Sequence, residues 1–171
     1  NILKFEKSEK VIINKQNLSK PTIKKINDSI LMLFLNKKRD ASKILSNQKK
    51  LKNKNMEILG KMKKLVFVAK NIIKKNKKNI INDLGNLLSK TWDLKMENNK
   101  NVSYKYVDHL NKEGLKLGAY GGKLLGAGGG GYFLFLTNKK SKRKIILKFK
   151  NLIKVDVKIY NFGTKIIYKN I

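Results

Sequence analysis

The stretch "GAYGGKLLGAGGGGYFLFL", residues 118–136, places the strongest constraint on how this chain can fold. Eight of the chain's 12 glycines lie in its first 14 residues. Glycine has no Cβ, so a loop of this kind can approach a ligand closely, and its successive N–H groups can form a concave anion site. One or two glycines suffice for a tight turn, whereas Gly128 to Gly131 is a run of four. We therefore predict a loop that faces a ligand.

Three common sequence patterns do not fit this loop. A Walker A motif fails because Leu117 stands at its first glycine position and Leu124 follows Lys123. The letters "GAGGGG" match the dinucleotide fingerprint, but a helix is expected before them and a strand after them, which is the reverse order. The letters "GAYG" match the KH loop without a helix directly after it. The glycine amides and Lys123 remain as candidates for binding phosphate.

Apolar periodicity in the first hundred residues predicts strands followed by helices. The segments "ILKF" and "KVIIN" flank a charged turn and predict a hairpin, Pro21 is expected to close that region, and "SILMLFLN" (29–36) predicts a buried strand. Apolar residues three and four apart then indicate amphipathic helices. These helices are expected near residues 41–51, 58–72 and 80–96, with the lysine-rich break "KKNKK" before the last.

The remainder of the chain predicts one more helix before the glycine loop and mainly strands after it. Residues 103–117 indicate a helix that turns Tyr106, Val107 and Leu110 inward and ends at Gly118. The later elements are a strand "YFLFLT", a basic helix "KKSKRKIILKFKNL", a strand with Val155, Val157 and Ile159, and a last strand "TKIIYKN". This order predicts a single α+β domain over residues 1–171, with an antiparallel sheet covered by helices.

Composition limits the class of protein but says little about a partner. The chain is 41% hydrophobic, has no cysteine and no apolar run near the ~20 residues of a membrane span, so a globular cytoplasmic protein is expected. The net charge of +30 is compatible with nucleic-acid binding. Only Arg39 and Arg143 are arginine, however, and the lysines are spread along the chain. Lysine, asparagine and isoleucine have AT-rich codons, so the excess is interpreted as compositional and a nucleic-acid partner is not expected.

The other polar and aromatic candidates are interpreted as structural. Asp40 is placed to cap a helix, and Ser42 falls in that helix's first turn. His109, the chain's one histidine, has no Asp or Ser partner at a useful spacing and is expected at the surface. Trp92 continues an apolar stripe and is expected in the core. No metal-binding cluster is predicted among Asp, Glu and His.

The glycine stretch resembles the third conserved motif of the GHMP kinases, and within them the heptose 7-phosphate kinase branch. The resemblance extends to "LMLFLNKKRDASKILSNQ", "LSKTWDLKM" and "VKIYNFGTKIIY" and covers nearly the whole chain. It implies a ferredoxin-like C-terminal domain of a kinase that uses ATP and Mg²⁺. It also implies that the N-terminal ATP-binding domain, absent from this chain, would hold most of both. We expect this fragment alone to be inactive and to contain no catalytic residue.

The resemblance also implies a set of site residues. The loop residues Gly126, Ala127, Gly128, Gly129 and Gly130, with Lys123, would line the active site near a sugar or sugar-phosphate substrate. Arg39 matches the family arginine and is a possible substrate contact. The chain departs from the branch just before it, where Leu35-Asn36 stand in place of Thr-Gly.

Two alternatives stay open on the sequence alone. One is a basic nucleic-acid-binding module that uses the glycine loop against a backbone. The other is a regulatory or structural α+β domain that keeps the loop without the chemistry.

Overall fold

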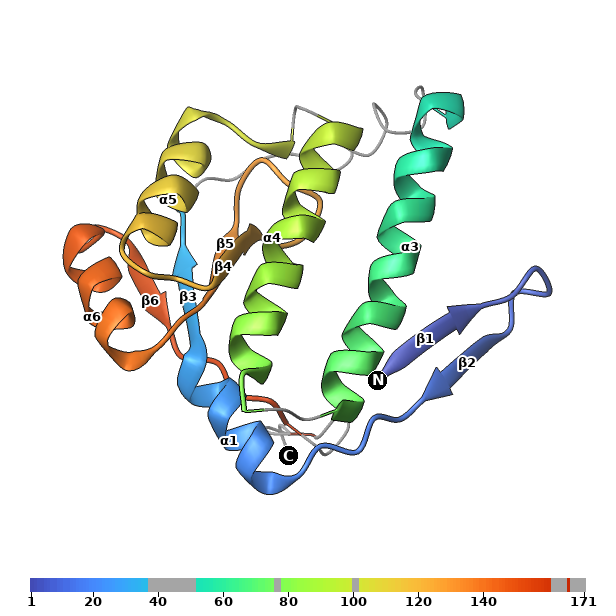
Figure 1. The fold of residues 1–171 in the computed structure, drawn as a ribbon. Helices are drawn as coiled ribbons and strands as arrows, with labels where there is room; N and C mark the ends of the chain where they lie inside the picture. Colours follow the sequence, from blue (N-terminus) through green and yellow to red (C-terminus); the bar gives the residue numbers. More distant parts are fainter. Residues whose placement is uncertain (37–51, 76–77, 100–101, 161–165, 167–171) are drawn as a thin grey trace, which may run out of the picture.

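The computed structural model describes residues 1–36, 52–75, 78–99, 102–160 and 166. It is an α+β fold, as predicted, with a four-stranded antiparallel sheet in the order β4-β5-β3-β6 and a separate two-stranded hairpin. The strands are β1 (Ile2–Phe5), β2 (Val11–Asn14), β3 (Ile30–Phe34), β4 (Gly121–Leu124), β5 (Tyr132–Leu136) and β6 (Ile153–Val155). The helices are α1 (Lys20–Ser29), α3 (Lys52–Lys75), α4 (Ile80–Asn98), α5 (Lys105–Lys116) and α6 (Lys139–Lys148). Helices α3 and α4 run side by side, and the β1–β2 hairpin lies next to α3, away from the main sheet (Figure 1).

Several predicted elements are confirmed. The first hairpin pairs Ile2 with Asn14 and Phe5 with Val11, and the predicted buried strand is β3, the neighbour of both β5 and β6. The lysine-rich break separates α3 from α4, and the basic helix is α6. The predicted helix near 41–51 and, apart from Ile166, the predicted last strand lie outside the described residues, as do Arg39, Asp40 and Ser42.

Helix α1 was not predicted, because Pro21 was interpreted as the end of a region when it lies in the first turn of a helix. Proline is tolerated in a first turn, where its missing N–H has no intrahelical acceptor. Ser19 caps this helix, and its hydroxyl accepts a hydrogen bond of 3.4 Å from the N–H of Thr22. The sequence signal was therefore a helix start.

Three other predictions need correction. Strand β4 was not predicted, since two of its four residues are glycines, which strands disfavour. Tyr106 was expected to point inward but is 41% exposed, while its neighbour Val107 is buried. Strand β6 ends at Val155, so Val157 and Ile159 follow the strand and do not lengthen it.

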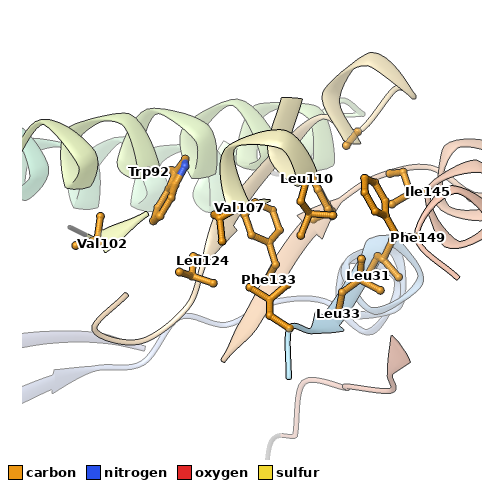
Figure 2. Packing of buried hydrophobic residues seen from close by; sticks show 13 residues of the cluster. Leu31, Leu33, Trp92, Val102, Val107, Leu110, Leu124, Phe133, Ile145 and Phe149 are labelled. Carbon is orange, nitrogen blue, oxygen red and sulfur yellow. The ribbon is translucent and has the colours of Figure 1, made fainter. Parts of the chain in front are cut away.

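The core lies between the sheet and helices α4, α5 and α6 (Figure 2). Alternate residues of the two central strands face it, namely Leu31, Leu33, Phe133 and Phe135, all at most 1% exposed. Trp92 of α4 is fully buried, as predicted, with its ring edge against that of Phe133 at 6.5 Å between centroids. Full burial of such side chains contributes about 1.5–3 kcal/mol each, so this cluster fixes α4 and α5 on the sheet. No helix in the described part of the chain is long and apolar enough to cross a membrane.

Candidate functional site

The glycine-rich residues 125–131 form the turn that connects β4 to β5. The two strands pair with Leu124 opposite Phe133, and the N–H of Leu125 donates a 2.8 Å hydrogen bond to the carbonyl of Tyr132. The turn carries positive φ angles at Gly128 (118°) and Gly129 (76°). Residues with a Cβ rarely adopt such angles. The structure thus brings five predicted site residues, numbers 126 to 130, into one turn at an edge of the sheet.

Val102 supports the back of this turn. The N–H of Gly129 donates to the carbonyl oxygen of Val102 at 2.8 Å, and Val102 is fully buried. A Cβ on Gly128 would lie 2.7 Å from the Val102 Cβ, closer than two carbons can approach. The segment after α4 therefore fixes the turn's position, and it leaves room there for glycine alone.

Helix α4 lies against β4 at van der Waals distance. A Cβ on Gly121 would lie 1.8 Å from the carbonyl oxygen of Gly85 in α4. The hydroxyl of Ser89, one turn further along the helix, accepts a 3.3 Å hydrogen bond from the N–H of Gly122. Paired glycines allow this approach because neither brings a side chain between helix and strand. The close contact carries the C-terminal half of α4 to the mouth of the glycine turn.

Lys95 is the functional candidate that sequence reasoning missed. It is half-buried on α4, and its ammonium donates a hydrogen bond to the carbonyl oxygen of Gly126. Burial lowers the Lys95 pKa, and the nearby charge of Lys123 lowers it further. The spacing of Gly85, Trp92 and Lys95 does place them on one face of a helix, and Lys95 falls within "LSKTWDLKM". It was one of 41 basic residues, however, and nothing in the sequence distinguished it from the other lysines.

Lys123, a predicted site residue, lies on β4 next to Lys95. It is half-buried and pairs in register with Leu134, so it points away from the sheet face that carries Leu124 and Phe133. Burial lowers the pKa of Lys123. Within the described residues, no carboxylate forms an ion pair with either lysine. Two positive charges without a counterion therefore lie beside the glycine turn.

Most of the turn's amides have no hydrogen-bond acceptor among the described residues. Gly129 uses its N–H on Val102, which removes that amide from the predicted set of anion donors. The N–H groups of Gly126, Ala127, Gly128 and Gly130 have no hydrogen-bond acceptor in the part of the chain that the structure describes. Free N–H donors beside two ammonium groups fit the oxygens of a phosphate.

The other end of the turn leads to the end of strand β3. The N–H of Leu35 donates a 2.9 Å hydrogen bond to the carbonyl of Gly131, and the rings of Phe34 and Tyr132 lie 5.1 Å apart. Arg39, the remaining predicted site residue, lies outside the described residues. Its predicted contact with substrate stays a prediction.

Groups that could hold a metal ion are not gathered at this site. Among the described residues, no set of three or more His, Cys, Asp or Glu side chains converges anywhere. Mg²⁺ takes oxygen ligands such as carboxylates and phosphates, whereas ammonium and amide groups are donors. This site therefore fits a phosphate group and does not fit Mg²⁺ by itself. His109 is exposed, as predicted, with its ring edge against that of Phe149.

A second hollow is formed by residues other than those of the glycine turn. It is a groove of about 880 Å³ between the β1–β2 hairpin and α3. Its walls include Ile2, Leu3, Val66 and Lys70. None of the predicted site residues lines it.

Comparisons with known proteins identify what this chain is similar to. Residues 70–154 match the family model described as GHMP kinases C terminal. The chain is 26% identical over 148 residues to the D-glycero-alpha-D-manno-heptose 7-phosphate kinase of Campylobacter jejuni, covering 85% of this chain and 43% of that protein. It is 27% identical over 144 residues to the bifunctional fucokinase/GDP-fucose pyrophosphorylase of Arabidopsis thaliana, covering 82% of this chain and 14% of that protein.

The fold has a solved counterpart. The crystal structure of Methanococcus jannaschii mevalonate kinase superposes with a TM-score of 0.67 at 22% identity, over 91% of this chain and 46% of that chain. This similarity concerns the fold alone. The chain spans less than half the length of each of these three relatives.

Proposed function

This chain carries a GHMP kinase C-terminal domain, and on that premise we propose that it forms one wall of the active site of an ATP-dependent small-molecule kinase. The second wall would come from an N-terminal kinase domain that supplies the nucleotide-phosphate loop. In this arrangement Gly126, Ala127, Gly128, Gly129 and Gly130 line the site with Lys123, and Arg39 contacts the substrate.

One observation carries the proposal: within the described residues, a glycine turn most of whose amides have no acceptor lies beside two lysines that pair with no carboxylate. Phosphoryl transfer needs positioned reactants and donors that stabilise charge on the moving phosphoryl group, and it needs little covalent chemistry from the protein. Ammonium groups and backbone amides are donors of this kind. The turn and the lysines therefore supply what the acceptor side of such a site requires.

ATP and Mg²⁺ are the proposed cofactors, and this chain would contribute little to holding them. Bound Mg²⁺ would bridge phosphate oxygens and offset their charge. Its protein ligands would come from the N-terminal domain, because the described residues offer no group of three or more His, Cys, Asp or Glu side chains that could hold a metal ion. The same reasoning assigns no catalytic base to this chain and predicts that the chain alone does not transfer phosphoryl groups.

A sugar or sugar phosphate is the proposed acceptor, with a heptose 7-phosphate first among the candidates. Two of the relatives reported above are named for kinases of sugars or sugar phosphates. A phosphorylated acceptor would also present a dianion to the positive end of the site. Another relative is named as a mevalonate kinase. Mevalonate carries a single carboxylate and no phosphate, so it is the acceptor with which sugar phosphates should be compared.

The test is an acceptor panel with the protein expressed from its complete reading frame. ATP consumption is measured with heptose 7-phosphate, other sugar phosphates, free sugars and mevalonate. We expect the highest turnover with a sugar phosphate. Turnover with mevalonate alone would overturn the proposed acceptor, and no turnover with the whole panel would overturn the kinase proposal.

Nucleic-acid binding has no support among the relatives reported above, since each is named as a kinase. The positive charge is also spread over many exposed lysines on every helix of the described chain. A polycation of this kind binds nucleic acid weakly and without regard to which lysine is removed.

A further inference from the structure

Lys95 and Lys123 form an arrangement of two half-buried cations that disfavours the folded state. Each side chain is half-buried, and the charge of Lys123 lies close enough to Lys95 to lower the Lys95 pKa. Like charges that share a partly desolvated site repel each other. Long lysine stems usually extend their charged ends into water, but here the close packing of α4 on β4 holds both beside the glycine turn.

Neither lysine forms an ion pair with a carboxylate of the described residues. Lys95 donates to the carbonyl oxygen of Gly126, which uses one of its three N–H donors. The carboxylates nearest in sequence, Asp93 and Glu97, are exposed, and neither forms an ion pair with Lys95. The missing counterion would have to come from outside the described chain.

The glycine turn limits the kind of anion that fits. The N–H groups of Gly126, Ala127, Gly128 and Gly130 have no acceptor among the described residues, and the carbonyl that Lys95 binds belongs to the same turn. A phosphate has several acceptor oxygens and can accept from ammonium and amide donors at once. A single carboxylate has fewer acceptor oxygens than a phosphate.

We propose that Lys95 and Lys123 together form a phosphate-binding subsite at the mouth of the glycine turn, in which Lys95 also positions the turn through the Gly126 carbonyl. The inference rests on the proposed function, because it adds Lys95 to the same active site. The phosphate could be the one that a sugar phosphate already carries or the phosphoryl group in transfer. Both present the same chemistry to the lysines.

The first experiment measures binding without any catalysis. The protein from the complete reading frame is labelled with [¹⁵N]glycine and titrated with inorganic phosphate, and the shifts of the glycine-turn amides give a Kd. Lys95→Met removes the charge and the hydrogen bond but keeps an apolar stem of similar length. Loss of a charged hydrogen bond should raise this Kd about 10-fold to 100-fold.

Three matched variants interpret that result. Lys90→Met removes an exposed lysine from the same helix and should leave the Kd unchanged. Lys95→Arg keeps the charge and should recover most of the affinity, and Lys123→Met should weaken binding as Lys95→Met does. A Kd that stays within about twofold of wild type in both Met variants would overturn the subsite, as would an equal loss in Lys90→Met.

The second experiment identifies the source of the phosphate and separates this inference from the proposed function. It compares the steady-state kinetics of Lys95→Met with those of the wild-type protein. If the variant has a raised KM for the sugar phosphate and an unchanged KM for ATP, the subsite binds the phosphate of the acceptor. If the variant has a lowered kcat, the subsite binds the phosphoryl group in transfer. If the wild-type protein phosphorylates nothing but still binds phosphate in a Lys95-dependent way, the kinase proposal fails and the subsite stands. If it is an active kinase whose phosphate binding ignores Lys95, the subsite fails alone.

Discussion

The N–H of Gly129 donates a 2.8 Å hydrogen bond to the carbonyl oxygen of Val102, and this bond joins the glycine turn to the segment that follows α4. The contact spans 27 residues of sequence and fixes a turn whose glycines could otherwise take many conformations. It means that the buried core holds the turn in position. A preformed turn is what a site based on positioned amides requires.

The contact between Gly128 and Val102 predicts a large difference between two alanine substitutions in one turn. Gly128→Ala would place a Cβ 2.7 Å from that of Val102 at a φ of 118°, so we expect a loss of about 2–4 kcal/mol in the free energy of unfolding. Gly126→Ala meets nothing within 4 Å at a φ of 73° and should lose only about 1–2 kcal/mol. Urea unfolding followed by the fluorescence of Trp92 measures both. Equal losses would contradict the packing described here.

The close approach of α4 to β4 predicts that two other glycines respond in opposite directions. Gly121→Ala directs a Cβ at the Gly85 carbonyl oxygen, 1.8 Å away, so the helix must move, and we expect a loss of about 3 kcal/mol. Gly60→Ala lies on the exposed side of α3 with nothing within 4 Å. It should raise the free energy of unfolding by about 0.5–1 kcal/mol, because alanine favours the helix. Thermal unfolding of the two variants gives the signs directly, and a stable Gly121→Ala protein would refute the contact.

The buried lysines predict how stability changes at high pH. Burial lowers the Lys123 pKa from 10.5, and burial and the charge of Lys123 lower that of Lys95. Between the lowered pKa values and 10.5, the unfolded chain therefore binds more protons than the folded chain, and stability rises with pH in that window. The charges oppose folding most at neutral pH, and this effect fades as pH passes through the folded pKa values.

Comparison with Lys123→Met isolates this effect from the many exposed lysines. The wild-type free energy of unfolding should rise relative to the variant as the pH passes from the lowered pKa of Lys123 up to 10.5. The variant lacks one of the two charges, and its Lys95 loses a repulsive neighbour. Urea midpoints measured at several pH values test this. Parallel curves for the two proteins would show that the lysines are not held together as described.

Local sequence patterns predicted most of the fold because each corresponds to a strong physical preference. The apolar run at Ile30–Phe34 could only be stable in a buried strand, and the three- and four-residue spacing of apolar residues fixed α3 and α4. Helix α1 escaped prediction because the proline dominated the interpretation, although Ser19 provides an N-cap. Strand β4 was not predicted because its glycines disfavour a strand when considered locally. They are needed there because α4 packs closely against the strand, and no local pattern encodes that contact.

The site was predictable only in part. The glycine run could be recognised as a candidate site from the sequence, since few structural roles require four consecutive glycines. Lys95 depends on a contact with Gly126 across 31 residues, and its lysine code is shared with most of the surface. Only the three-dimensional arrangement distinguishes a lysine that contacts the glycine turn from one in solvent. Gly129 shows the reverse case, because its amide was predicted to be free and is bound to Val102.

Gly129→Val in the protein from the complete reading frame tests the central claim most directly, with ATP-dependent phosphorylation of the preferred sugar phosphate as the readout. Valine is strained at a φ of 76° and would displace the turn from its place on Val102. We expect turnover to fall about 100-fold or more, while circular dichroism shows a folded protein and Lys90→Met keeps wild-type turnover. Wild-type turnover in a folded Gly129→Val protein would contradict the assignment of this turn to the active site.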